Sequence, residues 1–354
     1  MFRFLKALIA ARKFLFLGSP LKGSISVQSV QSGENGLVVA LPLNSDTQPA
    51  GLHSMFWDNR TGHSLVRALP ITEQDSRRFE VVRDFGKPVK VGDLVWLSGW
   101  NGDQPEDFGL HGVSEVALPN GTSAYYSAGS KVWVIHVHGR TATRSEPLRN
   151  FTTISTLGFS QISISHETDE PPLGLGKRRS YLGAKEWLQV EAAVNYAISH
   201  GATRVVLFGF SLGAMFIGEF LRKSPLADIV ESVVFDSPLI DFESTLNLQS
   251  LRAGFDATLG SYGLQLMQDS RIFRLFGLHQ PEIPTLLRDV GKPGLVFYSA
   301  QDGYVSMQRI PMLAELNPDF RFVSFANGKH CRLYNQEPER YTKELLSFLE
   351  DYRT

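Results

Sequence analysis

Along the second half of the chain, hydrophobic and polar residues follow two different patterns, one typical of strands and one typical of helices. Short apolar, β-branched runs alternate with stretches whose apolar residues recur every three or four positions. The expected strands lie at 132–137, 159–165, 205–208, 229–235, 294–299 and 320–325. One expected helix places Trp187, Val190, Val194, Ala197 and Ile198 on a single face and ends at Gly201, and a closing helix carries Tyr341, Leu345, Phe348, Leu349 and Tyr352. This order predicts a doubly wound, mostly parallel α/β sheet.

The region before this alternation has a β-like pattern with no helical period. Its expected strands are short runs at 26–30, 36–41, 79–82 and 93–97, separated by clusters of turn-forming residues. We interpret residues 24–111 as a small β-rich accessory domain, with 100–111 as a linker. A hairpin with arms at 112–118 and 122–127 and an Asn-Gly turn then opens the main domain, 112–354.

Residues 241–288 interrupt the alternation of strands and helices. The segment is mostly helix-forming and rich in leucine, phenylalanine and methionine. It follows the expected strand at 229–235, so we expect it to lie over the carboxyl-terminal edge of the sheet. Ligands bind at that edge in open α/β sheets. The segment is therefore predicted to be a helical cap or lid.

The first 23 residues form a separate apolar and basic segment. Four cations (Arg3, Lys6, Arg12 and Lys13) interrupt its apolar residues, so no run approaches the roughly 20 residues that span a bilayer. Projected as a helix, its apolar positions do not gather on one face. We expect a helix packed on the protein's own surface; attachment to a membrane surface is the alternative.

The composition limits which cellular compartment and which binding partners we expect for the protein. The formal net charge of −1 gives no reason to expect nucleic acid as a partner. The single cysteine, Cys331, excludes an internal disulfide and fits the reducing cytoplasm. No clustered Cys/His pattern is present, so we expect neither a metal nor a cofactor.

The strongest chemical signal is Gly209-Phe-Ser211-Leu-Gly213, which fits the pattern G-x-S-x-G. A buried-type strand precedes it and a helical pattern follows, which is the context that a nucleophile elbow requires. A side chain at either glycine would collide with the neighbouring strand or helix. We therefore expect Ser211 to stand on a strained turn at a helix N-terminus, with its hydroxyl exposed above the sheet.

A serine hydroxyl needs a base, and the base needs an acid to orient it. His330 follows the last expected strand and is our candidate base. Asp302 ends the strand before it and is our candidate acid, with Asp236 as the alternative. For the oxyanion, we expect one backbone N–H from Leu212 and a second from Arg140, in the loop after the strand at 132–137.

From about residue 112 to the end, the chain resembles the α/β-hydrolase superfamily. The likeness rests on His138-Gly139, the elbow, Asp302 and His330 in their order, and the chain departs from many relatives at Ala214. The stretches at 137–147, 181–187, 190–194 and 236–241 look like bacterial serine hydrolases near the esterase, lysophospholipase and prolyl-oligopeptidase-like groups. The resemblance implies a Ser211–His330–Asp302 triad and an oxyanion hole at Arg140 and Leu212.

These observations predict a serine hydrolase that cleaves a carboxylic ester through an acyl-enzyme intermediate. The apolar insertion at 241–288 favours a small-molecule ester, acyl or lipid-like, over an amide. Two alternatives stay open at this point. One is a prolyl-oligopeptidase-like peptidase or amidase, and the other is a non-catalytic binding protein on the same fold.

Overall fold

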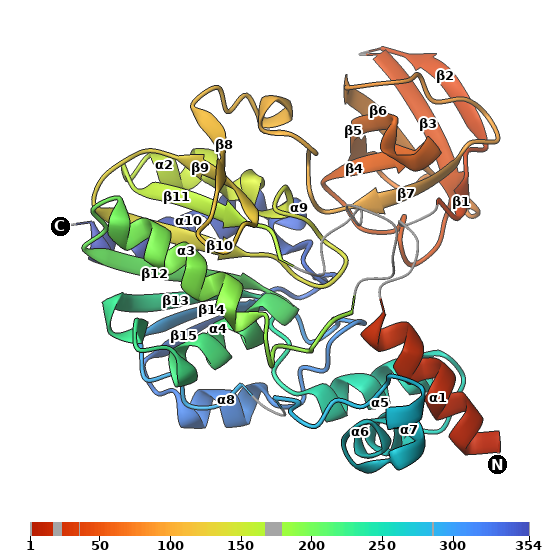
Figure 1. The fold of residues 1–354 in the computed structure, drawn as a ribbon. Helices are drawn as coiled ribbons and strands as arrows, with labels where there is room; N and C mark the ends of the chain where they lie inside the picture. Colours follow the sequence, from red (N-terminus) through yellow and green to blue (C-terminus); the bar gives the residue numbers. More distant parts are fainter. Residues whose placement is uncertain (1, 17–22, 35, 167–178, 285–286, 354) are drawn as a thin grey trace.

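The computed structural model describes residues 2–16, 23–34, 36–166, 179–284 and 287–353, and it contains two sheets (Figure 1). Parts of two expected segments, residues 1 and 17–22 of the N-terminal segment and 285–286 of the insertion, lie outside these ranges. The N-terminal sheet contains β1 (Ile25–Ser26), β2 (Ser29–Gly33), β3 (Gly36–Pro42), β4 (Leu52–Trp57), β5 (Gly62–Ala68), β6 (Ser76–Asp84) and β7 (Leu94–Ser98). The central sheet contains β8 (Val113–Ala117), β9 (Ser123–Ser127), β10 (Val132–Val137), β11 (Ser160–Ile164), β12 (Arg204–Phe210), β13 (Val230–Asp236), β14 (Gly294–Tyr298) and β15 (Phe320–Ser324).

The central sheet is the predicted mostly parallel one. Its strand order is β15-β14-β13-β12-β10-β11-β9-β8; pairs from β15 to β11 are parallel, and the β8–β9 hairpin adds antiparallel strands at one edge. Helices α3 (Trp187–Ser199) and α4 (Leu212–Lys223) cover one face, and α2 (Phe151–Ser155) and α10 (Pro338–Leu349) cover the other (Figure 1). Three further helices are α8 (Ile310–Leu316), α9 (Leu333–Gln336) and the N-terminal α1 (Phe2–Leu15).

Strand β12 shows why this sheet is buried on both faces. Val205 and Leu207 point into the core under α3 and α4, whereas Val206, Phe208 and Phe210 point into the core under α10. Successive side chains of a strand point to opposite faces, so a continuous apolar run fills two cores at once. On α3, the expected apolar face is confirmed at Val190, Val194 and Ala197, but Ile198 is exposed.

The N-terminal sheet is antiparallel throughout, with the order β1-β7-β4-β5-β6-β3-β2. Sequence analysis missed β4 and β5, because His53, Ser54, His63 and Ser64 interrupt their apolar pattern. These polar residues are nevertheless buried, and Ser54 Oγ lies 3.0 Å from His63 Nε2 across the two strands. Hydrogen bonding between buried polar groups offsets the cost of placing them in a core. The chain just after β7 is also packed against this sheet, since Trp100 is buried against Phe56.

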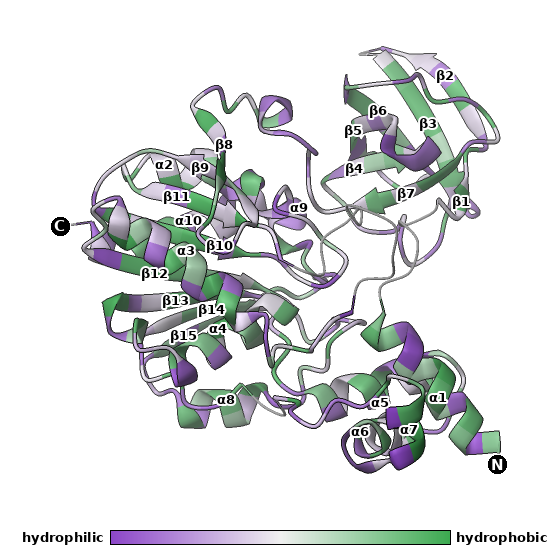
Figure 2. Ribbon diagram, viewed as in Figure 1, coloured by the Kyte–Doolittle hydropathy of each residue, from purple (hydrophilic) through white to green (hydrophobic). Residues whose placement is uncertain are grey.

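The insertion forms three helices, α5 (Phe242–Arg252), α6 (Leu259–Asp269) and α7 (Arg271–Leu275). Helix α1 packs beside them, and the four helices project together at one corner of the molecule (Figures 1 and 2). Ala7, Ala11 and Leu15 form the buried face of α1. The prediction of a helix packed on the protein's own surface is thus confirmed for residues 2–15. Among the described helices, none is long and apolar enough to cross a membrane.

Candidate active site

The turn between β12 and α4 is a tight, strained bend. Ser211 has φ 51° and ψ −115°, outside the regions that non-glycine residues ordinarily occupy. A Cβ at Gly209 would lie 2.8 Å from the backbone nitrogen of Ala214, and one at Gly213 would lie 2.2 Å from the carbonyl oxygen of Val137. Both glycines are therefore required by close backbone approach, and Ala214 does not disturb the turn. Backbone bonds from Ser211 N to Asp236 O and from Leu239 N to Ser211 O, both 2.9 Å, hold the bend in place.

The structure brings Ser211, His330 and Asp302 into one hydrogen-bonded series. Nε2 of His330 lies 2.8 Å from Ser211 Oγ, and Nδ1 lies 2.7 Å from Asp302 Oδ2. The tautomer with its proton on Nδ1 satisfies both contacts, since Nδ1–H donates to the carboxylate and Nε2 accepts from the hydroxyl. The other Asp302 oxygen accepts from the N–H groups of Tyr304 and Val305, at 2.8 and 3.1 Å. These bonds fix the carboxylate that orients the imidazole.

The electrostatics of this series favour a basic imidazole. Burial is the largest single influence and lowers the pKa of His330, but the charge and hydrogen bond of Asp302, together with the charges of Glu146 and Asp236, leave that pKa raised above 6.5. A higher pKa makes the imidazole a better proton acceptor from serine.

The alternative acid, Asp236, is engaged elsewhere. Its carboxylate accepts hydrogen bonds from Tyr341 at 2.9 Å and Ser237 at 2.9 Å, and it pairs with Arg149 at 3.3 Å. Burial raises the pKa of Asp236, and the Arg149 guanidinium partly offsets that rise. The structure thus places Asp302, and not Asp236, against the candidate base.

Cys331, next to His330, is a buried thiol. Burial raises its pKa well above the ordinary value of 9.0, so it stays protonated at neutral pH. A protonated thiol is a poor nucleophile, which argues against a Cys–His pair here.

The two expected oxyanion donors flank the nucleophile. Leu212 and Arg140 both line the same cavity as Ser211. A Cβ at Gly139 would lie 2.9 Å from Ser211 Cβ, so only glycine lets the Arg140 loop approach this closely. The site can therefore offer two N–H groups beside the hydroxyl.

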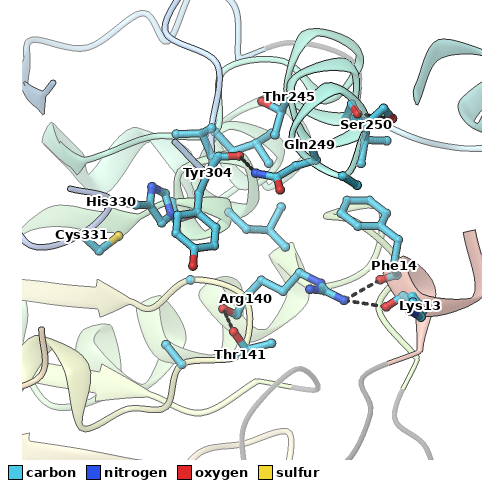
Figure 3. Close-up of a pocket in the computed structure, with 18 of the residues that line it drawn as sticks. Lys13, Phe14, Arg140, Thr141, Thr245, Gln249, Ser250, Tyr304, His330 and Cys331 are labelled. Atoms are coloured by element: carbon cyan, nitrogen blue, oxygen red, sulfur yellow. Dashed lines mark hydrogen bonds between the residues drawn. The ribbon is translucent and has the colours of Figure 1, made fainter. Parts of the chain in front are cut away.

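The side chain of Arg140 has a different role from its N–H group. Its Nη2 donates to the carbonyl oxygens of Lys13 and Phe14, at 2.9 and 3.1 Å (Figure 3). These carbonyls belong to the last turn of α1, where orphan acceptors and the negative end of the helix dipole favour a cation. Arg140 thus ties α1 to the candidate active site.

The serine opens into a cavity of about 870 Å³. Its walls come from four parts of the chain: α1, the N-terminal sheet, the insertion, and the loops of the central sheet. Representative wall residues are Ile9, Phe14, Trp96, Trp100, Leu246, Phe255, Met267 and Tyr304. Figure 3 shows Phe14, Arg140, Gln249 and Tyr304 around this space, and Gln249 Nε2 donates to the carbonyl oxygen of Tyr304 at 2.6 Å. Sequence reasoning missed the contributions of α1 and of Trp96 and Trp100, because no motif marks them.

A second serine–histidine contact exists in the N-terminal sheet. Ser54 Oγ lies 3.0 Å from His63 Nε2, and Asp107 lies 3.7 Å from the other ring nitrogen. Ser54 has no exposed surface, and burial lowers the pKa of His63 to about 4. A substrate has no access to this serine, so the pair is structural.

Comparison with known structures finds chains of similar fold. An esterase from Pyrococcus furiosus is similar to this chain in one crystal form with a TM-score of 0.52 and 19% identity, over 71% of this chain and 94% of the esterase. A second form gives a TM-score of 0.52 and 19% identity over 72% and 97% of the two chains. An α/β-superfamily hydrolase from Oenococcus oeni has a TM-score of 0.49 and 17% identity over 68% and 100%. No protein-family model matches the sequence, and the comparison with curated proteins finds no match.

The chain has the α/β-hydrolase fold. At this level of identity the likeness establishes the architecture alone, and the chemistry must be argued from the site.

Proposed function

We propose that the protein is a serine hydrolase that cleaves carboxylic esters through an acyl-enzyme intermediate. The observation that carries the proposal is the position of His330, in hydrogen-bonding contact with both Ser211 and Asp302. A non-catalytic scaffold has no need to keep these three groups aligned in a cavity. The esterase activity of the Pyrococcus furiosus neighbour supports the same reaction class.

The contacts support the following sequence of proton transfers. As Ser211 Oγ bonds to the ester carbonyl carbon, His330 Nε2 takes the hydroxyl proton and the carbonyl oxygen becomes negative. The N–H groups of Leu212 and Arg140 stabilise that oxygen. The bond to the leaving alkoxide then breaks, and His330 returns the proton to it, which gives an alcohol and an acyl-serine. Water repeats the steps, releasing the carboxylic acid and regenerating Ser211.

The cavity favours a substrate with an apolar acyl group. Leu246, Met267 and Phe255 of the insertion face the same space as Ser211. We therefore propose that α5–α7 act as a cap that forms an acyl pocket, with a lipid-like ester as the substrate class. Burying an acyl chain gains about 0.8 kcal/mol for each CH₂ group.

An amide substrate has less structural support. A prolyl-oligopeptidase-like enzyme usually carries a propeller of several small sheets. The described N-terminal strands β1–β7 instead form one antiparallel sheet. We place the enzyme in the cytoplasm on the evidence of its single, buried cysteine.

The deciding experiment is labelling with a fluorophosphonate probe, followed by assays on p-nitrophenyl esters and peptide anilides. We expect stoichiometric modification at Ser211, lost in Ser211→Ala and kept in Ser54→Ala, which removes the other serine that contacts a histidine. Turnover of esters should exceed that of anilides. Labelling at another serine would refute the site, and faster anilide turnover would reverse the choice of substrate.

A further inference from the structure

Exposed hydrophobic side chains concentrate on one part of the molecule, which we call the helical corner (α1 and residues 242–276). Of the sixteen large hydrophobic residues exposed in the described chain, eight lie there. They are Phe2, Leu5, Ile9, Leu251, Phe255, Ile272, Leu275 and Phe276. The side chains of Phe2 and Leu275 are 74% and 86% exposed, so neither is packed against the rest of the protein. Such a concentration marks an interaction surface.

The helices of this corner form one connected unit. The ring of Phe4 packs edge-to-face on Phe273 at 5.7 Å, which joins α1 to α7. The Lys6 ammonium lies over the rings of both Phe2 and Phe255, at 5.0 and 4.7 Å, and so bridges α1 to the loop before α6. The unit projects away from both sheets (Figure 2). A flat partner can therefore approach it without meeting the rest of the protein.

Helix α1 is apolar on two faces. Ala7, Ala11 and Leu15 pack inward, while Phe2, Leu5 and Ile9, spaced three and four apart, share an outward face. This explains why the sequence shows no single apolar side. The inward face packs α1 against the protein. The outward face is covered by no segment among the described residues.

The charge around this face is positive. Helix α1 carries four basic residues and no acidic one, while residues 242–276 carry three of each sign. Arg12, Lys13, Arg271 and Arg274 are all exposed. An apolar face flanked by cations fits the boundary between the headgroups and acyl chains of an anionic bilayer. A second copy of the chain fits less well, because a symmetric contact would bring the cations of α1 together.

The surface is continuous with the cavity that holds Ser211. Lys6, Ile9 and Phe255 belong both to the helical corner and to the cavity wall. A molecule leaving a lipid surface at this place would enter the cavity directly.

We propose that the helical corner docks on the surface of an anionic lipid bilayer and thereby presents the cavity to substrates held in it. Docking stands on the exposed residues and their charge alone. The benefit to catalysis rests on the proposed ester hydrolysis.

The test is co-sedimentation of the full chain with vesicles of phosphatidylcholine, with and without phosphatidylglycerol. We expect binding to the anionic vesicles that weakens with salt and is much lower on pure phosphatidylcholine. The double variants Phe2→Ser/Leu5→Ser and Leu275→Ser/Phe276→Ser should each weaken binding about tenfold or more, because each removes two large apolar groups. The control Ile71→Ser/Val91→Ser removes two exposed apolar residues elsewhere and should bind like the parent chain.

Three results would overturn docking. They are equal sedimentation with and without anionic lipid, equal loss in the control variant, and a dimer that dissociates in the two corner variants. Hydrolysis of a soluble short-chain ester separates the two proposals. We expect it to be unchanged in the corner variants, and its absence in the parent chain would refute the enzyme while leaving vesicle binding to be judged by itself.

Discussion

The central sheet and the N-terminal sheet contribute to the candidate active site in different ways. The central sheet supplies every group that we assign to the reaction, each at the end of a strand or in the loop after one. The N-terminal sheet supplies none of them, yet its carbonyl oxygens accept hydrogen bonds from the segment that carries His330. From these contacts we infer that the sheet expected to be accessory helps to position His330.

Three side chains, those of Arg149, Arg332 and Asn335, connect the N-terminal region to the segment that carries His330. Arg332 donates to the carbonyl oxygens of Leu97, at 2.7 Å, and Asp46, at 3.2 Å. Asn335 donates to the carbonyl oxygen of Leu52 and to Asn101 Oδ1, the latter at 2.6 Å.

Arg149 forms the central link. Its Nη1 donates to Gly99 O at 2.8 Å and to Cys331 O at 3.0 Å, so one guanidinium holds the N-terminal region and the neighbour of His330 together. Its other end pairs with buried Asp236. Because both charges are buried, removing either would leave the other without compensation.

The largest effect is expected in the central sheet. Ser211→Ala should lower kcat by about 10³–10⁶-fold, because the nucleophile is lost while binding and the oxyanion donors remain. Thermal unfolding should stay close to that of the parent chain. Residual ester hydrolysis within tenfold of the parent value would show that Ser211 is not the nucleophile.

Asp302→Asn tests the electrostatic half of the site. The carboxylate raises the pKa of His330, and the reaction needs the neutral imidazole, so activity should fall as the pH drops through that raised pKa. The variant should lose about 10³–10⁴-fold in kcat and move the acid limb of kcat/KM to lower pH. The pH profile is the measurement. An acid limb that stays in place would mean that another group controls the titration.

Arg332→Gln tests the N-terminal sheet. Losing its bonds to Leu97 and Asp46 should let the His330 segment move, and we expect kcat to fall about tenfold to a hundredfold with a smaller change in KM. The matched control is Arg67→Gln, an exposed arginine of the same sheet that pairs with Glu80. Equal activity in the two variants would show that the N-terminal sheet does not help to position His330.

Gly99→Ala is expected to have the smallest effect. An added Cβ would lie 2.8 Å from the carbonyl oxygen of Cys331, so the His330 segment must shift slightly. We expect kcat to fall severalfold, and by no more than about tenfold. Gly112→Ala, where a Cβ would have no neighbour within 4 Å, should leave kcat unchanged. A similar loss in both variants would indicate a general effect on folding.

The elbow could be predicted from sequence because its cause is local. Gly209, Ser211 and Gly213 encode a turn whose strain and close contacts involve residues only a few positions away or on the adjacent strand. The placement of His330 and Asp302 followed from topology, since parallel strands bring their carboxyl ends to one edge.

The support from the N-terminal region was not predictable in the same way. Arg332 and Leu97 are 235 positions apart, and a backbone carbonyl can accept from any donor, so neither residue type records the contact. Strands β4 and β5 were missed for a related reason. Ser54 pairs with His63 and Ser64 donates to Asp84 on a neighbouring strand, while His53 contacts the carbonyl oxygens of Pro49 and Ala50 in the loop before β4. A pattern of residue types along one segment does not reveal such partners.

The bridge made by Arg149, Arg332 and Asn335 sets a limit on protein engineering. A shortened chain beginning at residue 112 would keep all three reacting side chains and the complete parallel sheet. It would also strip acceptors from three donors and open the cavity wall at Trp96 and Trp100 to water. We therefore expect the shortened chain to lose most of the activity proposed for the parent chain.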